Sequence, residues 1–162
     1  AGLEILEDLP DVDAVVASIG GGGLIAGIGS ALRALKPDTK ILAAEPETAS
    51  PLATSFQAGT ASRFPNWEAS FVDGAGGKTV LPSMWPLLSS LVDDSIVVPL
   101  KEVAHAMRLI AERTRVIAEG AAACAVAAAL TGRAGSGKIV AIISGGNIDL
   151  QKFAALTADG TD

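Results

Sequence analysis

The sequence predicts an α/β fold, with an open, mostly parallel twisted sheet and helices on both of its faces. Strand-like apolar runs alternate with helical patterns along the chain, as they do in this fold class. The first such unit is complete within residues 13–45, and two of the apolar runs end directly in glycine-rich turns. A strand, a helix and a second strand in this order form a crossover unit whose strands run parallel.

The first unit begins with a buried strand at 13–19 and continues, after a glycine-rich turn, with a helix at 24–35. Pro37 ends this helix, and a second buried strand follows at 40–45. The apolar stripe predicted for the helix consists of Leu24, Ile28, Leu32 and Leu35.

The later elements continue the alternation. A helical period predicts an amphipathic helix at 101–115, and an alanine-rich run predicts a buried helix at 121–130. The inward face predicted for the amphipathic helix consists of Val103, Ala104, Met107, Ile110 and Ala111. The other predicted elements are helices at 50–57, 82–91 and 150–156, a loop-rich stretch at 58–79, and strands at 95–98 and 138–143, the last of them buried.

The composition excludes several classes of protein. Hydrophobic residues make up 49% of the 162 residues and the mean hydropathy is +0.45, which excludes a disordered chain and suits a single α/β domain over 1–162. A net charge of -6 and a pI near 4.7 argue against a nucleic-acid partner. The longest weakly charged stretch, 116–130, contains Glu119 and is too short to span a membrane.

The single cysteine and the first residues bear on where the protein is found and how it is made. Cys124 cannot form a disulfide within the chain, and no signal peptide is recognisable, so we expect a cytoplasmic protein. The first helix, around Ile5 and Leu9, has no capping residue, and the chain opens on Ala1. This start predicts a fragment or one chain of a processed protein, and the alternative is a frayed chain end.

Four consecutive glycines, Gly20–Gly23, lie between the first strand and the helix that begins at Leu24. Backbone N–H groups without neighbouring Cβ atoms can converge on an anion there, and the N-terminus of the helix adds its dipole. The turn therefore predicts a phosphate site. A plain tight turn with a positive φ is the alternative, although one glycine would satisfy it.

The same residues also fit a dinucleotide. Gly21-x-Gly23-x-x-Ala26 matches the dinucleotide fingerprint, and Glu45 ends the next strand where a ribose-binding acid lies, so a Rossmann-type NAD-binding domain is an alternative. A run of four glycines is not usual in that fingerprint. A Walker A loop is excluded, because no Gly-Lys-Ser/Thr follows the turn.

A second glycine turn, SGGN at 144–147, follows the strand at 138–143. Ligands of open α/β sheets bind at the carboxyl ends of strands, so both turns are expected to face one ligand, with Ser144 offering a neutral hydroxyl. A helix start capped by Ser144 or Asn147 is the alternative. Glu119, at the beginning of the alanine-rich helix, is either a third site residue or an acid favoured there by the helix dipole.

Five motifs occur in one order along the chain: GGGGL at 20–24, AEP at 44–46, DGA at 73–75, AEGA at 118–121 and SGGN at 144–147. In this order the chain resembles the threonine dehydratase and serine racemase family of pyridoxal-phosphate enzymes, which have the tryptophan synthase β-like fold. The resemblance covers nearly the whole chain but only the second half of the catalytic unit. It implies a lyase of amino-acid metabolism, a threonine ammonia-lyase that converts L-threonine to 2-oxobutanoate and ammonia, or its serine counterpart.

The resemblance also implies roles for single residues. Ser144 matches the serine that hydrogen-bonds the pyridine nitrogen, Glu119 and Gly74 match positions that line the cofactor, and Gly145 flanks the same site. The loop that holds the cofactor phosphate is matched by Gly20, Gly21, Gly22, Gly23 and Leu24.

A metal site is implied less completely. Glu45 and Ala49 match two ligands of a divalent-cation site in serine racemases, whose third ligand is an aspartate. Pro51 stands at that position here, which leaves the site one oxygen ligand short.

Two motifs of the family are absent from this chain. The lysine that binds the cofactor covalently, in a Ser-Phe-Lys motif, and the Ser-Gly-Asn-His loop for the substrate carboxylate both lie upstream of the glycine loop. The SFQ sequence at 55–57 lies downstream, and glutamine cannot replace the lysine. We therefore expect no catalytic residue in this chain and no activity without the missing N-terminal half.

The expected partners are the amino-acid substrate, the missing N-terminal half and, once complete, further copies in a homo-oligomer. A non-catalytic module that binds pyridoxal phosphate or phosphate is the remaining alternative. His105 is expected to have a surface or packing role, and Cys124 a packing role.

Overall fold

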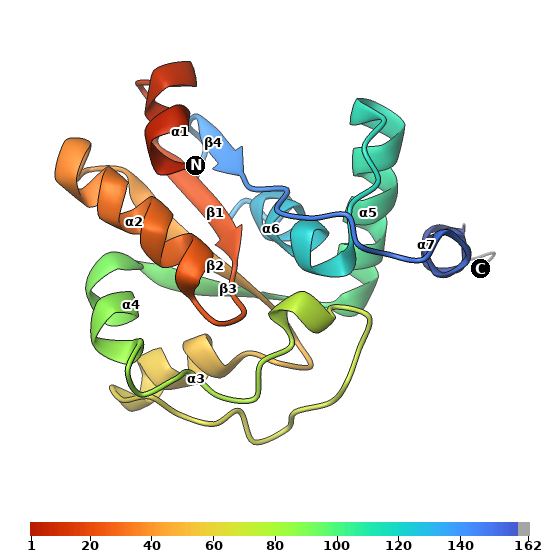
Figure 1. Cartoon of the computed structure of the whole chain (residues 1–162), viewed down its shortest axis with the longest axis horizontal. Helices are drawn as coiled ribbons and strands as arrows, with labels where there is room; N and C mark the ends of the chain where they lie inside the picture. Colours follow the sequence, from red (N-terminus) through yellow and green to blue (C-terminus); the bar gives the residue numbers. More distant parts are fainter. Residues whose placement is uncertain (159–162) are drawn as a thin grey trace.

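A parallel four-stranded sheet forms the centre of the computed structural model, which describes residues 1–158 (Figure 1). Its strands lie in the order β3-β2-β1-β4 and all pair in parallel, so the predicted α/β class is confirmed. The strands are β1 (Ala14–Ser18), β2 (Lys40–Pro46), β3 (Asp94–Val98) and β4 (Ile139–Ala141).

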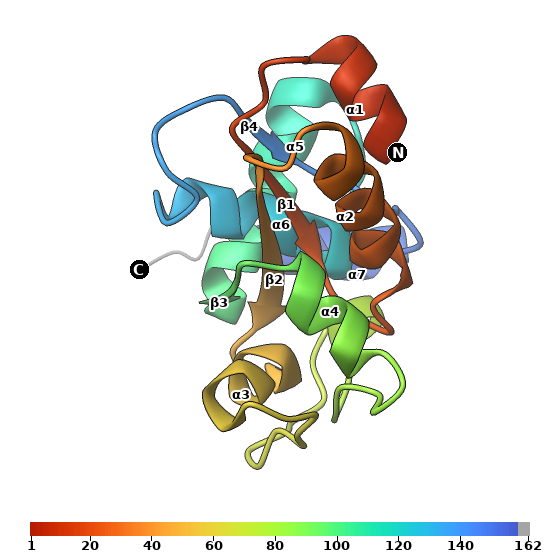
Figure 2. The same cartoon turned by 90° about the vertical axis from the view of Figure 1, so that its left-hand side faces the viewer.

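Helices cover both faces of the sheet, with α1, α2 and α4 on one face and α5 and α6 on the other (Figure 2). In β1, Val15 and Ala17 pack toward the first group, whereas Ala14 and Val16 pack toward the second. The helices are α1 (Gly2–Asp8), α2 (Gly23–Leu35), α3 (Pro51–Ala58), α4 (Trp85–Leu91), α5 (Leu100–Thr114), α6 (Gly120–Leu130) and α7 (Leu150–Thr157), with a short 3-10 helix, η1 (Asp73–Ala75). Among the described residues, no helix is long and apolar enough to cross a membrane.

The buried stripe of helix α2 agrees only in part with the predicted one, since Ile28 and Leu32 are buried as predicted. Leu24 and Leu35 are 39% and 63% exposed, although both were expected to face the core. The buried side is formed by Ile25, Ala26, Ile28, Gly29 and Leu32. Glycine belongs to this side because the backbone at Gly29 approaches Leu91 of α4 and Ile41 of β2 too closely for a large residue.

Two further details differ from the sequence expectation. In α5, Ala106 is buried and Ala104 is only half-buried, so the inward face is rotated slightly. β4 spans three residues instead of the six predicted at 138–143, and it is half-buried rather than buried. The reason is its position, because β4 pairs with β1 alone and lies at an edge of the described sheet.

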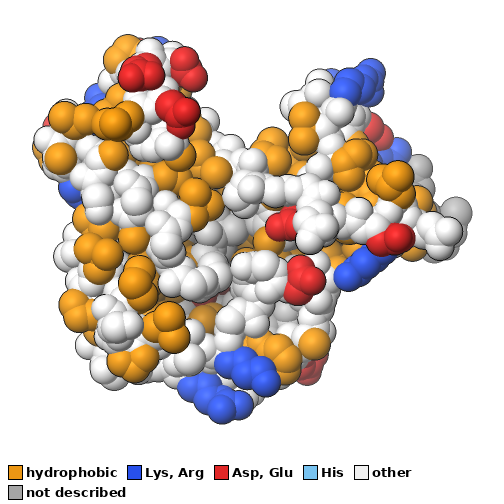
Figure 3. Space-filling view, viewed as in Figure 1, with side chains coloured by type: hydrophobic (Ala, Val, Ile, Leu, Met, Phe, Trp, Pro, Cys, Tyr) orange, Lys and Arg blue, Asp and Glu red, His pale blue; other side chains and the backbone are white. Residues whose placement is uncertain are grey.

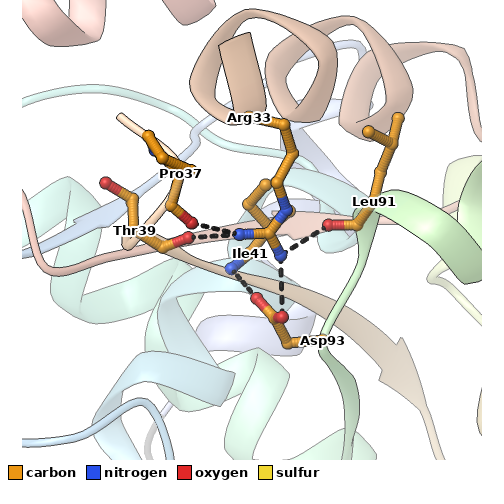
Figure 4. Close-up of polar contacts among 6 residues, drawn as sticks. All are labelled: Arg33, Pro37, Thr39, Ile41, Leu91 and Asp93. Carbon is orange, nitrogen blue, oxygen red and sulfur yellow. Dashed lines mark hydrogen bonds and ion pairs between the residues drawn. The ribbon is translucent and has the colours of Figure 1, made fainter. Parts of the chain in front are cut away.

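The side chain of Arg33 ties the C-terminal end of α2 to the sheet (Figure 4). Its guanidinium donates hydrogen bonds to the carbonyl oxygens of Pro37, Thr39 and Leu91 and pairs with Asp93 at 2.7 Å. The second carboxylate oxygen of Asp93 accepts from the N–H of Ile41 at 2.7 Å. The starts of β2 and β3 and the ends of α2 and α4 are therefore held together at one point, which fixes the direction in which α2 points toward the other end of the sheet.

Candidate functional site

Segments far apart in the sequence meet at the carboxyl ends of β1 and β4, around the N-termini of α2 and α6. They enclose a cavity of about 200 Å³. Its lining residues are Ser18, Gly20, Gly21, Gly22, Gly23, Leu24, Gly74, Glu119, Ala121 and Ser144. Every residue that we predicted to contact the cofactor lies on this cavity except Gly145, so the structure brings the predicted set together.

Two glycines of the first turn are needed by the fold itself. A Cβ atom on Gly20 would overlap the carbonyl oxygen of Gly74, because the η1 segment passes directly against the turn. Gly22 has a φ of +91°, in the left-handed region that favours glycine. The plain-turn alternative therefore accounts for Gly22, and the close packing against η1 accounts for Gly20.

The other two glycines of the turn have no such reason. A Cβ atom on Gly21 or Gly23 would meet nothing within 4 Å in the described chain. Neither residue has a φ in the left-handed region. Both line the cavity and both are exposed. Their missing side chains therefore leave open space in front of the N-terminus of α2, which is where an anion is favoured.

Glu119 positions the second glycine turn. Its backbone N–H donates to the carbonyl oxygen of Gly145 at 3.1 Å, and its carboxylate accepts from the N–H of Asn147 at 3.0 Å. A Cβ atom on Gly145 would lie 2.9 Å from the Glu119 carboxylate, so a larger residue there would push this side chain aside. Glu119 is the N-terminal cap residue of α6, but its side chain caps no N–H of that helix. The carboxylate thus binds the turn that carries Ser144.

The capping alternative for the second glycine turn is wrong. Helix α7 is capped by Asp149, whose side chain accepts from the N–H groups of Gln151 and Lys152. Ser144 lies five positions earlier, is exposed, and lines the cavity. Its hydroxyl is therefore available to a ligand rather than committed to a helix start.

Gly74 lies where three parts of the site touch. The carbonyl oxygen of Gly74 lies against Gly20, and a Cβ atom on Gly74 would lie 2.9 Å from the Cβ of Ala121 and 3.4 Å from the Glu119 carboxylate. The long connection between α3 and α4 thereby reaches back to the sheet and closes one side of the cavity. Periodicity could not place this residue, and only the resemblance pointed to it.

Glu45 has a structural role, because its carboxylate joins β2 to α3 and β3 through hydrogen bonds. The residue is fully buried, and its carboxylate accepts from the N–H groups of Leu52 at 2.7 Å and Ala53 at 2.8 Å and from the hydroxyl of Ser95 at 2.6 Å. Desolvation raises the pKa of this carboxyl above its usual value, and the hydrogen bonds from Ser95, Leu52 and Ala53 oppose the rise.

The surroundings of Glu45 fit neither a metal nor a ribose. Both carboxylate oxygens already accept hydrogen bonds, Ala49 is buried, and Pro51 offers no acidic ligand. Within residues 1–158 no group of three or more His, Cys, Asp or Glu side chains could hold a metal ion. A fully buried Glu45 also cannot serve as the acid of a dinucleotide site.

The remaining reactive side chains lie away from the cavity or are inert. Burial raises the pKa of the Cys124 thiol to about 12, so it is not a nucleophile at neutral pH. His105 is exposed on α5. No lysine is among the residues that line the cavity in the described part of the chain.

One residue of the cavity, Ser18, was missed from the sequence. It ends β1, lines the cavity, and is 8% exposed. A polar residue at the last position of an otherwise apolar strand was the available signal.

Comparisons with known proteins show the family of this chain. Residues 1–145 match the family model described as pyridoxal-phosphate dependent enzyme. The L-threonine ammonia-lyase of Thermotoga maritima is 40% identical over 160 residues, which are 98% of this chain and 40% of the relative. The catabolic L-threonine dehydratase TdcB of Escherichia coli is 38% identical over 160 residues, 96% of this chain and 48% of the relative. The chain thus spans less than half the length of these relatives.

Solved structures show the same fold. Maize serine racemase aligns with a TM-score of 0.86 at 37% identity. The alignment covers 95% of this chain and 48% of the racemase chain. The processed form of threonine deaminase isoform 2 from Solanum lycopersicum aligns with a TM-score of 0.88 at 31% identity, over 96% of this chain and 46% of its own. On the family match and these likenesses, the chain belongs to the pyridoxal-phosphate dependent enzymes, a family whose cofactor is pyridoxal phosphate.

Proposed function

We propose that this chain is the cofactor-phosphate-binding half of a pyridoxal-phosphate-dependent threonine or serine dehydratase, and that it is inactive alone. The observation that carries the proposal is the open space at Gly21 and Gly23, on a cavity that also holds Ser144. The fold does not need these two glycines, whereas a phosphate in front of α2 does need the space.

The residues of the cavity fit the cofactor in chemical type. Backbone N–H groups of the turn at 20–24 and the dipole of the 13-residue helix α2 would bind the phosphate. The Ser144 hydroxyl would hydrogen-bond the ring nitrogen and, being neutral, would leave that nitrogen unprotonated. Glu119 would hold the Ser144 turn in place through Asn147 and Gly145. The bound cofactor supplies an electron sink for the α-carbon of an amino acid.

The missing catalytic group would come from the other half of the protein. A lysine there would bind the cofactor and move the α-proton, and this chain would hold the phosphate and the ring so that the lysine can reach them. By analogy with the threonine ammonia-lyases that it resembles, the substrate is L-threonine or L-serine and the products are a 2-oxo acid and ammonia. The sole cysteine is buried and unpaired, which supports a reducing, cytoplasmic setting.

The surface of the described chain supports such a partner half. The outer edge of β4 is unpaired within the described residues, and Ile143 just after it is 39% exposed. An apolar hollow of about 650 Å³ lies between α1 and α2, is lined by Leu3, Leu24 and Ile28 among others, and adjoins the cavity through Gly23. Figure 3 shows orange side chains gathered over this part of the molecule. Open strand edges and apolar hollows are normally covered.

Binding of pyridoxamine 5′-phosphate tests the phosphate site, because this compound has no aldehyde to react with surface lysines. The Gly21→Asp variant places a carboxylate in the open space, so we expect its affinity to fall about tenfold or more. Gly27→Asp is the matched control, because Gly27 also has nothing within 4 Å but lies on the exposed side of α2, off the cavity. Equal affinity in Gly21→Asp and Gly27→Asp would contradict the proposal.

The rate of 2-oxobutanoate formation tests whether this chain is inactive without the other half of the protein. With L-threonine and pyridoxal phosphate, the chain alone should form 2-oxobutanoate no faster than the free cofactor does. A faster rate would show that the chain is catalytic by itself. Enhancement of NADH fluorescence in place of pyridoxamine phosphate binding would favour the dinucleotide alternative.

A further inference from the structure

Ser18 carries a buried hydroxyl that nothing in the described chain satisfies. Its Oγ is the one buried side-chain oxygen or nitrogen without a hydrogen-bond partner among residues 1–158. The residue is 8% exposed, lines the same cavity as the glycine turn, and lies two positions before Gly20 in the chain. Buried hydroxyls are nearly always paired, so an unpaired one at a ligand site indicates a missing partner.

The neighbours of Ser18 do not supply that partner. The Cys124 thiol lies beside it on α6, but sulfur is a weak donor and a weak acceptor, and this thiol stays protonated at neutral pH. The contact forms no hydrogen bond of ordinary geometry, since the Ser18 oxygen remains without a partner. Two other lining residues, Glu119 and Ser144, have polar side chains, but neither forms a hydrogen bond with the Ser18 hydroxyl. The Glu119 carboxylate instead accepts from the N–H of Asn147.

The cavity is suited to an acceptor with negative charge. The space that Gly21 and Gly23 leave open faces the positive end of the α2 dipole. An N-terminus of this kind prefers an anion with several acceptor oxygens, and a hydroxyl on the same segment can donate one further hydrogen bond to it.

We propose, on the basis of the function proposed above, that the Ser18 hydroxyl donates a hydrogen bond to the phosphate group bound by the glycine turn. Ser18 and the turn belong to one continuous segment, whereas Ser144 reaches the cavity from β4. The phosphate is therefore assigned to Ser18 and the ring to Ser144. In the ligand-free protein the Ser18 hydroxyl has no partner, and the ligand provides one.

The Ser18→Ala variant tests this assignment through two measurements of the full chain. Without ligand, its Tm should equal or exceed that of the wild type, because an unsatisfied hydroxyl has been removed. With pyridoxamine 5′-phosphate or inorganic phosphate, its Kd should rise about tenfold, as expected for a lost hydrogen bond to a charged group. Ser30→Ala is the matched control, because the Ser30 hydroxyl donates to Ala26 within α2 and lies off the cavity; it should leave both Kd values unchanged.

Each other result overturns the assignment in a different way. If Ser18→Ala lowers the Tm and leaves both Kd values unchanged, Ser18 is a structural partner of Cys124. If only pyridoxamine 5′-phosphate weakens and inorganic phosphate does not, the hydroxyl contacts the ring. If the wild type binds neither probe, the proposed function itself fails, whereas normal wild-type binding with an unchanged Ser18→Ala variant refutes the Ser18 inference alone.

Discussion

Replacement of Arg33 by alanine should destabilise the protein by about 2–3 kcal/mol. The hydrogen bonds of Arg33 to the carbonyls of Thr39 (3.0 Å) and Leu91 (2.9 Å) are partly buried, and each contributes roughly 1 kcal/mol net. The contacts with Pro37 and Asp93 are exposed and together add roughly 0.5 kcal/mol. The loss of the side chain's packed aliphatic stem accounts for the upper end of the range.

Urea unfolding followed by circular dichroism measures this difference as a shift of the midpoint at constant slope. Arg33→Lys should lose most of the same stability, because one ammonium cannot reach the acceptors that a planar guanidinium bridges. Arg133→Ala is the matched control: Arg133 pairs with Asp94 at 3.7 Å on the exposed surface and should contribute roughly 0.5 kcal/mol or less. An Arg33→Ala variant as stable as Arg133→Ala would refute the reasoning.

Three further changes have defined outcomes. Burial raises the pKa of the Glu45 carboxyl above 4.5, so on raising the pH the unfolded chain loses this proton before the folded chain does. The contribution of Glu45 to the free energy of unfolding is therefore greatest below pH 4.5 and declines as the pH rises through the raised pKa. Urea unfolding of Glu45→Gln at several pH values should lack this decline. Cys124, with a pKa of about 12 and a buried thiol, should resist a thiol reagent at mildly alkaline pH in the native protein and react fully once unfolded. Gly20→Ala should lower the unfolding free energy by roughly 1–3 kcal/mol through its overlap with Gly74, whereas Gly21→Ala should change it by less than about 0.5 kcal/mol.

The order of the elements was predictable because burial on both sides of a parallel sheet leaves continuous apolar runs. The two turns were predictable because glycines and a serine follow such runs directly. The stripe of α2 was misplaced because Ala26 and Gly29 carry little hydrophobic signal, yet their small size lets the backbone approach its neighbours. The true extent of β4 depends on its place at the sheet edge, which is a tertiary property.

The site, like the fold, was predictable from the sequence only in part. Gly20 and Gly22 look identical to Gly21 and Gly23 in the sequence. Only the folded structure separates the pair that the fold requires from the pair that it does not. Ser18 was read as part of a buried strand, because no local pattern reveals that a hydroxyl will lack a partner.

The cavity is lined by residues from the end of β1, the start of α2, η1, the start of α6 and the turn after β4, so it exists only when these distant segments have come together. A ligand that binds this cavity cannot bind the unfolded chain, and its binding energy is added in full to the folding equilibrium. At a free concentration one hundred times its Kd, such a ligand stabilises the fold by about 2.7 kcal/mol. If the proposed phosphate site binds the cofactor, the supply of cofactor would then set how much of the protein stays folded.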